Sequence, residues 1–339
     1  MSLQPDDLPT VVRHARLAAL LTALSSLGVP DALAGGPLQA GELARRVGVP
    51  PDRLDRLLRA ATGEGAFDLG EDGYALTDFS RQLRREGDGS MGSMLVGWSM
   101  LRVGQVALAH LDTAVRDGTS GVEAAYGRSF HAYLDAHPDE AQRYGRAMES
   151  TVESFAAGAR AYDFSEFDTV VDVGGGLGGL LVAVIREHPG VRGILFDLPR
   201  VVAAAPAALA PHPESDRIDV VAGDLFHDLP RGADAYVYST VLRCLDDDAC
   251  LDALRACAVA ARPGSQVLAV EMVLPEGVPP SPSGLADVYA MAVYGGKDRT
   301  EAQWADLMTS AGFGKPAFHP VEGPYVIVAA TVAGQEVGP

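Results

Sequence analysis

Apolar runs and helix-spaced apolar positions alternate along the C-terminal half of the chain. From Val170 onward, runs rich in β-branched residues predict strands near 169–173, 192–196, 218–221, 235–239 and 266–271, with a closing pair near 315–319 and 324–330. Apolar positions at helical spacing predict helices over 180–188, 199–208, 246–260 and 301–311. This order predicts an α/β fold: an open, Rossmann-like sheet with helices on both faces and a ligand beyond the carboxyl ends of its first strands.

The first ninety residues show a different pattern. Helical spacing predicts a helix over 11–27 that stops at Gly28, followed by short helices over 31–34, 43–47 and 52–61. Two short apolar runs, 66–69 and 74–76, flank the turn residues Gly70 to Gly73 and predict a hairpin. Helices closed by a hairpin resemble a winged helix. Acidic residues dilute its arginines, so we expect this module to bind a partner subunit rather than DNA.

Residues 92–160 are predicted to be helical, with breaks at Gly104, at 118–121 and at His137-Pro138. The predicted organisation is therefore a winged-helix-like dimerisation domain over 1–91, a helical linker over 92–160 that contributes to the substrate pocket, and a ligand-binding α/β domain over 161–339.

Composition excludes several classes of partner. The formal charge of −18, with only two lysines, argues against nucleic acid and against an anionic membrane. The chain has no apolar run of about eighteen residues and no basic start typical of a signal peptide, so we expect a soluble cytoplasmic protein. The three cysteines lie on one segment without a histidine cluster, which predicts neither a metal site nor a disulfide framework.

A glycine-rich turn follows the first predicted strand of the C-terminal half. Gly174, Gly176 and Gly179 match G-x-G-x-x-G, and Asp197 ends the next predicted strand, where it could bind the hydroxyls of a ribose. Asp172 precedes the turn, and its carboxylate would repel the pyrophosphate of a dinucleotide. S-adenosylmethionine has a ribose, an ammonium and a sulfonium but no phosphate, so it fits this turn better than NAD. The alternative is a purely structural turn that Asp172 caps.

Further motifs carry a resemblance that covers nearly the whole chain. They are Val171-Asp-Val-Gly-Gly-Gly176, Phe196-Asp-Leu-Pro199, Ala222-Gly-Asp-Leu-Phe226, Arg262-Pro-Gly264 and Gly295-Gly-Lys-Asp-Arg-Thr300. In this order the chain resembles the S-adenosylmethionine-dependent O-methyltransferases of the plant caffeate type and their bacterial natural-product relatives. The resemblance implies methylation of a hydroxyl on an aromatic or polyketide-type molecule, S-adenosylhomocysteine as product, and a homodimer.

The resemblance also implies roles for individual residues. Asp172 would lie near the ammonium, Asp197 and Leu198 at the ribose, and Asp224 at the adenine amino group. The other implied cofactor contacts are Gly174 and Gly176 at the methionine part, Leu225 and Phe226 along the adenine ring, and Ser239 near the reacting methyl. The implied substrate contacts are Trp98, Tyr144, Met148, Asp287 and Met291.

One departure from the family pattern concerns the catalytic base. Plant members carry Leu-His-Asp-Trp-Ser-Asp after the fourth strand, and the histidine is the base, whereas this chain has Arg243 at that position in Leu242-Arg-Cys-Leu-Asp-Asp247. An arginine does not release its proton in a protein, so Arg243 cannot act as the base. Glu271 and Asp298 match the two acids that flank the histidine, and we expect Arg243 to form an ion pair with them.

Three mechanisms remain open. In the first, Arg243 faces the pocket, lowers the pKa of a phenol or binds a substrate carboxylate, and orientation alone promotes transfer. In the second, Glu271 or Asp298 is the base, which requires burial to raise its pKa. In the third, the fold keeps S-adenosylmethionine but catalyses decarboxylation, hydroxylation or a pericyclic reaction. A non-catalytic protein that binds S-adenosylmethionine is the remaining alternative.

Overall fold

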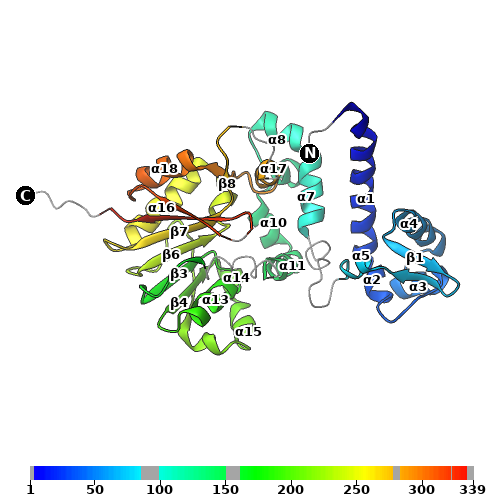
Figure 1. Ribbon diagram of the computed structural model, residues 1–339, viewed down its shortest axis with the longest axis horizontal. Coiled ribbons are helices and arrows are strands. Elements are labelled where there is room, and N and C mark those ends of the chain that lie inside the picture. Colours follow the sequence, from blue (N-terminus) through cyan, green and yellow to red (C-terminus); the bar gives the residue numbers. More distant parts are fainter. Residues whose placement is uncertain (1–3, 85–98, 150–160, 278–282, 322, 334–339) are drawn as a thin grey trace, which may run out of the picture. The chain divides into compact units, whose positions relative to one another are not determined.

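The chain divides into two compact units. The computed structural model describes residues 4–84, 99–149, 161–277, 283–321 and 323–333. The first unit comprises Met1–Gln105 and Asp139–Ser150, and the second comprises Val106–Pro138 and Thr151–Pro339. The domain boundaries expected after residues 91 and 160 stay a prediction. Figure 1 labels many of the helices and strands.

The first unit contains the predicted helices and hairpin. Its elements are η1 (Pro5–Asp7), α1 (Leu8–Ser26), α2 (Val29–Ala32), α3 (Ala40–Val47), α4 (Pro51–Gly63), β1 (Phe67–Gly70), β2 (Gly73–Leu76) and α5 (Asp78–Arg81). Strands β1 and β2 pair antiparallel, and Leu38 forms an isolated bridge with Tyr74. A side chain at Gly73 would lie 2.3 Å from the Leu38 carbonyl oxygen, so only glycine permits this bridge. The predicted helices-plus-hairpin module is confirmed.

Five helices follow within the described residues 99–149. They are α7 (Ser99–Ala109), α8 (Leu111–Asp117), α9 (Gly121–Tyr126), α10 (Phe130–Ala136) and α11 (Pro138–Glu149). The breaks predicted at 118–121 and at His137-Pro138 are confirmed, and Gly118 ends α8 in the left-handed conformation. The break predicted at Gly104 is wrong, because Gly104 lies inside α7. A single glycine costs a helix only about 1 kcal/mol, which its neighbours can offset.

A seven-stranded sheet forms the centre of the second unit. Its strands, in the spatial order β10-β11-β7-β6-β3-β4-β5, are β3 (Thr169–Val173), β4 (Arg192–Asp197), β5 (Ile218–Ala222), β6 (Ala235–Ser239), β7 (Gln266–Glu271), β10 (Ala317–Pro320) and β11 (Val326–Thr331). The five neighbouring strands β5, β4, β3, β6 and β7 are parallel to one another. Strand β11 pairs antiparallel with β7 and with β10. All seven predicted strands are confirmed. A short pair, β8 (Val273–Leu274) with β9 (Arg299–Thr300), was not predicted.

Helices cover both faces of this sheet (Figure 1). On one face, α16 (Asp247–Ala260) and α18 (Glu301–Ser310) pack on residues such as Val171 and Tyr236. On the other, α13 (Gly179–Glu187) and α15 (Ala205–Leu209) pack on residues such as Val170 and Val237. Successive strand residues therefore enter opposite cores, as the period of two requires.

The single helix predicted over 199–208 is wrong. Two short helices occupy this stretch, α14 (Pro199–Val202) and α15, and Pro206 lies in the first turn of α15. Proline has no backbone N–H to donate to the preceding turn, so it starts a helix more readily than it continues one.

The strand order places a switch point at β3. From β3 the chain moves to β4 and β5 on one side and then returns to β6 on the other side. Ligands of open α/β sheets bind at the carboxyl ends of the strands where the order reverses. The turn after β3 carries the glycines, so the predicted ligand turn lies at this point.

Candidate cofactor and active site

The turn between β3 and α13 depends on its glycines. Gly174, Gly176 and Gly178 have φ values of 70°, 62° and 93°, which favour glycine strongly. A side chain at Gly174 would lie 2.7 Å from a methyl group of Val241, the second residue after β6. The turn therefore requires glycine for its conformation and for its close contact with the segment after β6.

Asp172 is the most unusual group at this turn. It lies on β3, is 1% exposed, and neither carboxylate oxygen has a partner among the described residues. Burial, with a smaller contribution from the charge of Asp197, raises its pKa to about 7. A buried carboxyl group without a hydrogen bond is costly, which favours a donor or a cation supplied by a ligand.

Asp197 lies at the end of β4 and supports the same turn. One carboxylate oxygen accepts the N–H of Gly176 at 2.9 Å, and the other accepts the N–H of Leu198 at 2.6 Å. Burial raises the pKa of Asp197, and these two hydrogen bonds partly oppose the rise. Each carboxylate oxygen can accept a further bond, so Asp197 is positioned and still able to bind hydroxyl groups.

A more exposed acid, Asp224, follows strand β5. Its carboxylate accepts the N–H of Phe226 at 3.0 Å. Leu225 and Phe226 are half-buried and pack against the core on the α16 face. The structure thus brings Asp224 and the two apolar side chains together after a strand that neighbours β4.

The segment after β6 approaches the glycine turn. The hydroxyl oxygen of Ser239 is buried and has no partner among the described residues. Thr240 is the one non-glycine residue of the described chain with a positive φ, 55°, a strained conformation that clusters at functional sites. Its neighbour Val241 contacts Gly174, and the short helix η3 (Leu242–Cys244) begins next. Sequence reasoning missed Thr240, because no residue type reveals such strain.

Arg243 and Asp298 form a bidentate ion pair. The Nε and Nη2 atoms of Arg243 donate to the two carboxylate oxygens of Asp298, both at 2.9 Å, and Nη2 also donates to the carbonyl oxygen of Ala286 at 3.1 Å. Burial acts to lower the pKa of Arg243, but the hydrogen bonds and charge of Asp298 outweigh it and raise the pKa. The expected ion pair is therefore present with Asp298.

Glu271 contacts the backbone rather than the guanidinium. One carboxylate oxygen accepts the N–H groups of Leu242 and Arg243 at 2.9 and 3.3 Å, and the other is buried without a partner among the described residues. Burial raises the pKa of Glu271 to about 8, although the charge of Arg243 opposes the rise. The burial that the second mechanism requires is thus present, and Glu271 is mainly protonated at neutral pH.

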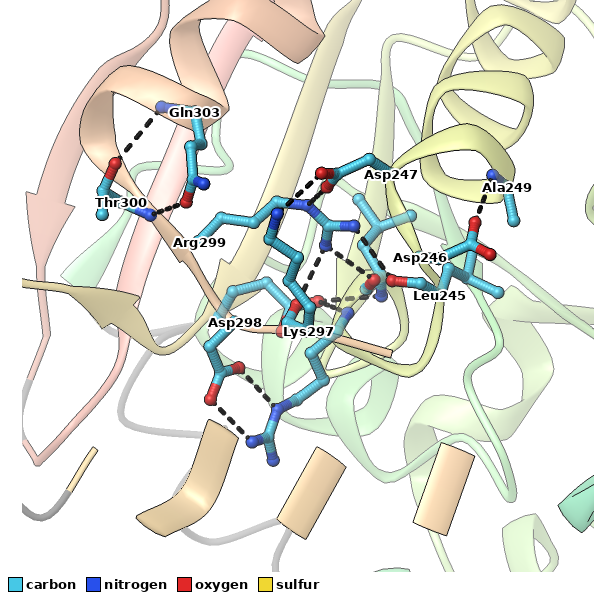
Figure 2. A network of polar contacts seen from close by, with 12 residues as sticks. Leu245, Asp246, Asp247, Ala249, Lys297, Asp298, Arg299, Thr300 and Gln303 are labelled. Carbon is cyan, nitrogen blue, oxygen red and sulfur yellow. Dashed lines mark hydrogen bonds and ion pairs between the residues drawn. The ribbon is translucent and has the colours of Figure 1, made fainter. Parts of the chain in front are cut away.

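A second arginine holds the η3 segment in place (Figure 2). Arg299 has no exposed surface and donates to the carbonyl oxygens of Leu242, Leu245 and Lys297 and to a carboxylate oxygen of Asp247, at 2.9–3.1 Å. A side chain at Gly296 would lie 2.1 Å from the Arg243 carbonyl oxygen. The backbone of η3 therefore packs directly against the backbone around Gly296. Arg299 donates hydrogen bonds to carbonyl groups of both segments. The sequence motif that contains Arg299 does not indicate this role, because the role depends on packing against η3.

The predicted substrate residues lie on separate elements. Asp287 and Met291 are half-buried on α17 (Ser283–Tyr294), and the Asp287 carboxylate accepts the N–H of Asp298 at 2.7 Å. Tyr144 and Met148 are half-buried on α11 of the first unit. Trp98 lies outside the described residues.

Two tyrosines share the surroundings of Arg243. Burial raises the pKa of Tyr289 on α17 and of Tyr325 before β11, and the charge of Arg243 lowers it in both cases. Tyr325 was missed by sequence reasoning. It reaches the carboxyl edge of the sheet because β11 runs antiparallel to β7, with Val326 paired to Glu271.

Within the described parts of the chain, every helix is too short or too polar to serve as a membrane span. No group of three histidine, cysteine or acidic side chains there is placed to hold a metal ion.

Comparison with known proteins gives consistent matches over both units. A family model described as "O-methyltransferase domain" matches residues 108–314, and one described as "O-methyltransferase dimerisation domain" matches residues 11–85. The 3-amino-4-hydroxybenzoate 4-O-methyltransferase of Streptomyces cremeus is 37% identical over 295 residues, which cover 84% of this chain and 79% of that protein.

Solved structures extend the similarity to the fold. The mitomycin 7-O-methyltransferase has a TM-score of 0.90 and 31% identity, and the match covers 97% of each chain. An O-methyltransferase from neocarzinostatin biosynthesis, crystallised with S-adenosylmethionine and 2-hydroxy-5-methyl naphthoic acid, has a TM-score of 0.84 and 33% identity, over 93% of this chain and 95% of that one.

Proposed function

This chain belongs to the S-adenosylmethionine-dependent O-methyltransferase family, and we propose that it methylates a hydroxyl group on a small aromatic molecule of secondary metabolism, as a homodimer. Two of the relatives named above act on, or bind, a hydroxylated benzoate and a hydroxylated naphthoic acid. The dimerisation domain matched at residues 11–85 supports the homodimer.

The observation that carries the proposal is the carboxyl group of Asp172, which has no hydrogen-bond partner among the described residues. It is buried beside a turn whose glycines exclude side chains, where a cationic ligand group would supply its missing partner. Pyrophosphate would add charge of the same sign as Asp172 and Asp197 at this turn. The residues present therefore fit S-adenosylmethionine and do not fit a dinucleotide.

We assign the cofactor contacts along the carboxyl ends of β3 to β6. Asp172 binds the ammonium, with Gly174 and Gly176 along the methionine part. Asp197 and Leu198 bind the ribose. Asp224 binds the adenine amino group, between Leu225 and Phe226. Ser239 contributes its hydroxyl group near the methyl group. The polar groups that would serve the ribose and the reacting methyl are buried or held by backbone hydrogen bonds, which limits their reorganisation on binding.

The reaction needs an oriented hydroxyl group more than a strong base. When bound, S-adenosylmethionine would supply a methyl group on a cationic sulfur, and the accepting hydroxyl group would release its proton to solvent water. Arg243 is a permanent cation held by Asp298, so it lowers the pKa of a hydroxyl group nearby. Glu271 fixes the backbone of η3 and stays mainly neutral. Asp287 and Met291, both on α17 of the second unit, are the proposed substrate contacts. The substrate roles expected for Trp98, Tyr144 and Met148 stay a prediction. Orientation alone can lower such a barrier by about 7–11 kcal/mol.

Binding calorimetry tests the cofactor assignment. S-adenosylhomocysteine should bind with a micromolar dissociation constant, and NAD should give no heat of binding. Asp197→Ala should weaken S-adenosylhomocysteine by about 1–3 kcal/mol, because it removes hydrogen bonds to a charged acceptor. Asp219→Ala, on an exposed side chain of β5, is the matched control. Binding of NAD without binding of S-adenosylhomocysteine would refute the assignment.

A further inference from the structure

Hydrogen bonds fix the backbone of Arg243 and two of the three nitrogen atoms of its guanidinium group. Its N–H donates to Glu271 at 3.3 Å, its carbonyl oxygen accepts the N–H of Lys297 at 2.9 Å, and its Nε and Nη2 atoms donate to Asp298 and Ala286. The Nη1 atom has no partner among the described residues. The side chain keeps 16% of its surface exposed. A guanidinium fixed in this way presents the two N–H groups of Nη1 in a defined direction.

The net charge of the side chains around Arg243 is compatible with binding one anionic group. Arg243 carries +1 and Asp298 carries −1, the charge of Asp287 beside Asp298 is opposed by that of Arg299, and Glu271 is neutral below a pKa of about 8. An aromatic carboxylate would bring −1, and a bound sulfonium would bring +1. A charged Glu271 would oppose such a substrate, whereas the protonated form does not. The charges therefore favour an anionic substrate beside a cationic cofactor.

The position of Arg243 links it to the reacting end of the cofactor site. Val241, two residues before it, would touch a side chain at Gly174, and Ser239, four residues before it, ends β6 with its hydroxyl group unpartnered. Burial raises the pKa of both Tyr289 and Tyr325, and the charge of Arg243 opposes this rise, so both tyrosines lie near Arg243. Arg243 therefore follows closely, along the segment after β6, the residue that packs against the glycine turn, and its charge acts on both tyrosines.

We infer that Arg243 is a substrate-binding residue whose Nη1 group binds a carboxylate on the aromatic ring, so that the preferred substrates are hydroxylated aromatic acids. This inference rests on the proposed function and adds to it the chemical class of the substrate. Guanidinium and carboxylate form strong, directional hydrogen bonds. The ion pair with Asp298 then serves to aim the guanidinium, in the way that an acid orients a histidine in a catalytic dyad.

If Arg243 had only a structural role, its replacement would have a different effect on activity. If the residue only held Asp298, its loss would lower the activity toward every substrate by the same factor. A residue that binds a substrate carboxylate discriminates between an acid and its amide, which has the same shape without the charge. The ratio of kcat/KM for acid and amide therefore separates the two roles.

The test uses two acid and amide pairs with methyl-labelled S-adenosylmethionine. The pairs are 3-amino-4-hydroxybenzoate with its carboxamide, and 2-hydroxy-5-methyl-1-naphthoate with its carboxamide. The dimeric full-length protein should methylate at least one acid with a kcat/KM about 10- to 100-fold above that of its amide. In Arg243→Gln this ratio should fall to near one, mainly through a higher KM for the acid. Arg243→Lys should restore only part of it, because lysine lacks the planar fork.

Controls keep the outcomes distinct. Arg255→Gln changes an exposed arginine of α16 and should leave the ratio unchanged. S-adenosylhomocysteine binding and the melting temperature of each variant report folding. An equal loss toward acid and amide in Arg243→Gln, or a wild type that labels amides as well as acids or labels neither, overturns the inference. Label in uncharged hydroxylated aromatics would still support the methyltransferase, whereas absence of label from every hydroxylated aromatic would refute the proposed function as well.

Discussion

Arg243 and Asp298 are joined by two hydrogen bonds of 2.9 Å, one from Nε and one from Nη2. The pair occupies the position where the plant relatives carry a histidine and an acid. The acid still orients its neighbour, but the neighbour now donates hydrogen bonds and cannot accept a proton. The residue at this position is therefore a fixed cation rather than a base, and we propose that orientation and electrostatics account for catalysis.

Replacing Glu271 by glutamine separates a supporting role from a catalytic one. The amide oxygen of Glu271→Gln can still accept the N–H groups of Leu242 and Arg243, so methyl transfer should stay within about tenfold of wild type. A base, by contrast, contributes typically about 10²- to 10⁴-fold. Single-turnover rates between pH 6 and 9 measure the difference. A loss above a thousandfold with normal cofactor binding would make Glu271 the base.

The same variant has a predicted effect on stability. The pKa of Glu271 is raised to about 8 in the folded protein, from 4.5. The folded state therefore binds more protons than the unfolded state between these values, and its stability falls as the pH rises through this window. Glu271→Gln removes this loss, so its melting temperature relative to wild type should rise between pH 6 and pH 9. A difference that does not change with pH would contradict the assignment.

Cofactor binding should depend on pH through Asp172. Its pKa is about 7 without ligand, and a bound ammonium favours the ionised form. The affinity for S-adenosylhomocysteine should therefore fall about tenfold from pH 8 to pH 6, since protonated Asp172 must first lose its proton. In Asp172→Asn the affinity should be weaker and nearly constant over this range. A wild-type affinity that is constant with pH would show that Asp172 does not face the ammonium.

Arg299 should matter for stability more than any exposed arginine. Arg299→Lys keeps the charge but cannot reach the three backbone carbonyls and Asp247 together. Loss of these buried bonds should cost about 2–4 kcal/mol and lower the melting temperature by roughly 5–10 °C. Arg255→Lys, at an arginine whose side chain is 55% exposed, should leave it within about 1 °C. Equal melting temperatures for both variants would contradict the proposed role of Arg299.

The homodimer is open to a direct measurement. Light scattering at micromolar concentration should give about twice the chain mass of 35.4 kDa. Val12→Asp adds a charge to an exposed valine of α1, inside the matched dimerisation domain, and should favour the monomer. Val259→Asp, at an exposed valine of α16, should remain dimeric. A wild type that is monomeric at these concentrations would refute the proposal.

Most of the fold could be predicted because its causes are local. The seven strands follow from runs of β-branched residues, and the turn after β3 follows from glycines that no other residue can replace there. The helix expected over 199–208 failed for a local reason too, because the effect of Pro206 was overlooked.

The candidate site was less predictable because it depends on long-range pairing. Tyr325 comes under the influence of the charge of Arg243 because β11 runs antiparallel to β7, which no local pattern indicates. The choice of Asp298 over Glu271 as the partner of Arg243 depends on packing between η3 and the segment around Gly296. The sequence indicates Arg243, Glu271 and Asp298 as site residues, but it does not indicate which of the two acids pairs with the arginine.

Methyl transfer itself is the central claim, and one incubation tests it. The protein is mixed with S-adenosylmethionine labelled in the methyl group and with hydroxylated aromatic acids and polyketides, and label and substrate are followed together. We predict that label appears in the aromatic product in a one-to-one ratio with S-adenosylhomocysteine. Substrate conversion that requires S-adenosylmethionine but leaves the label on it would contradict the account and assign the site to non-methylating chemistry.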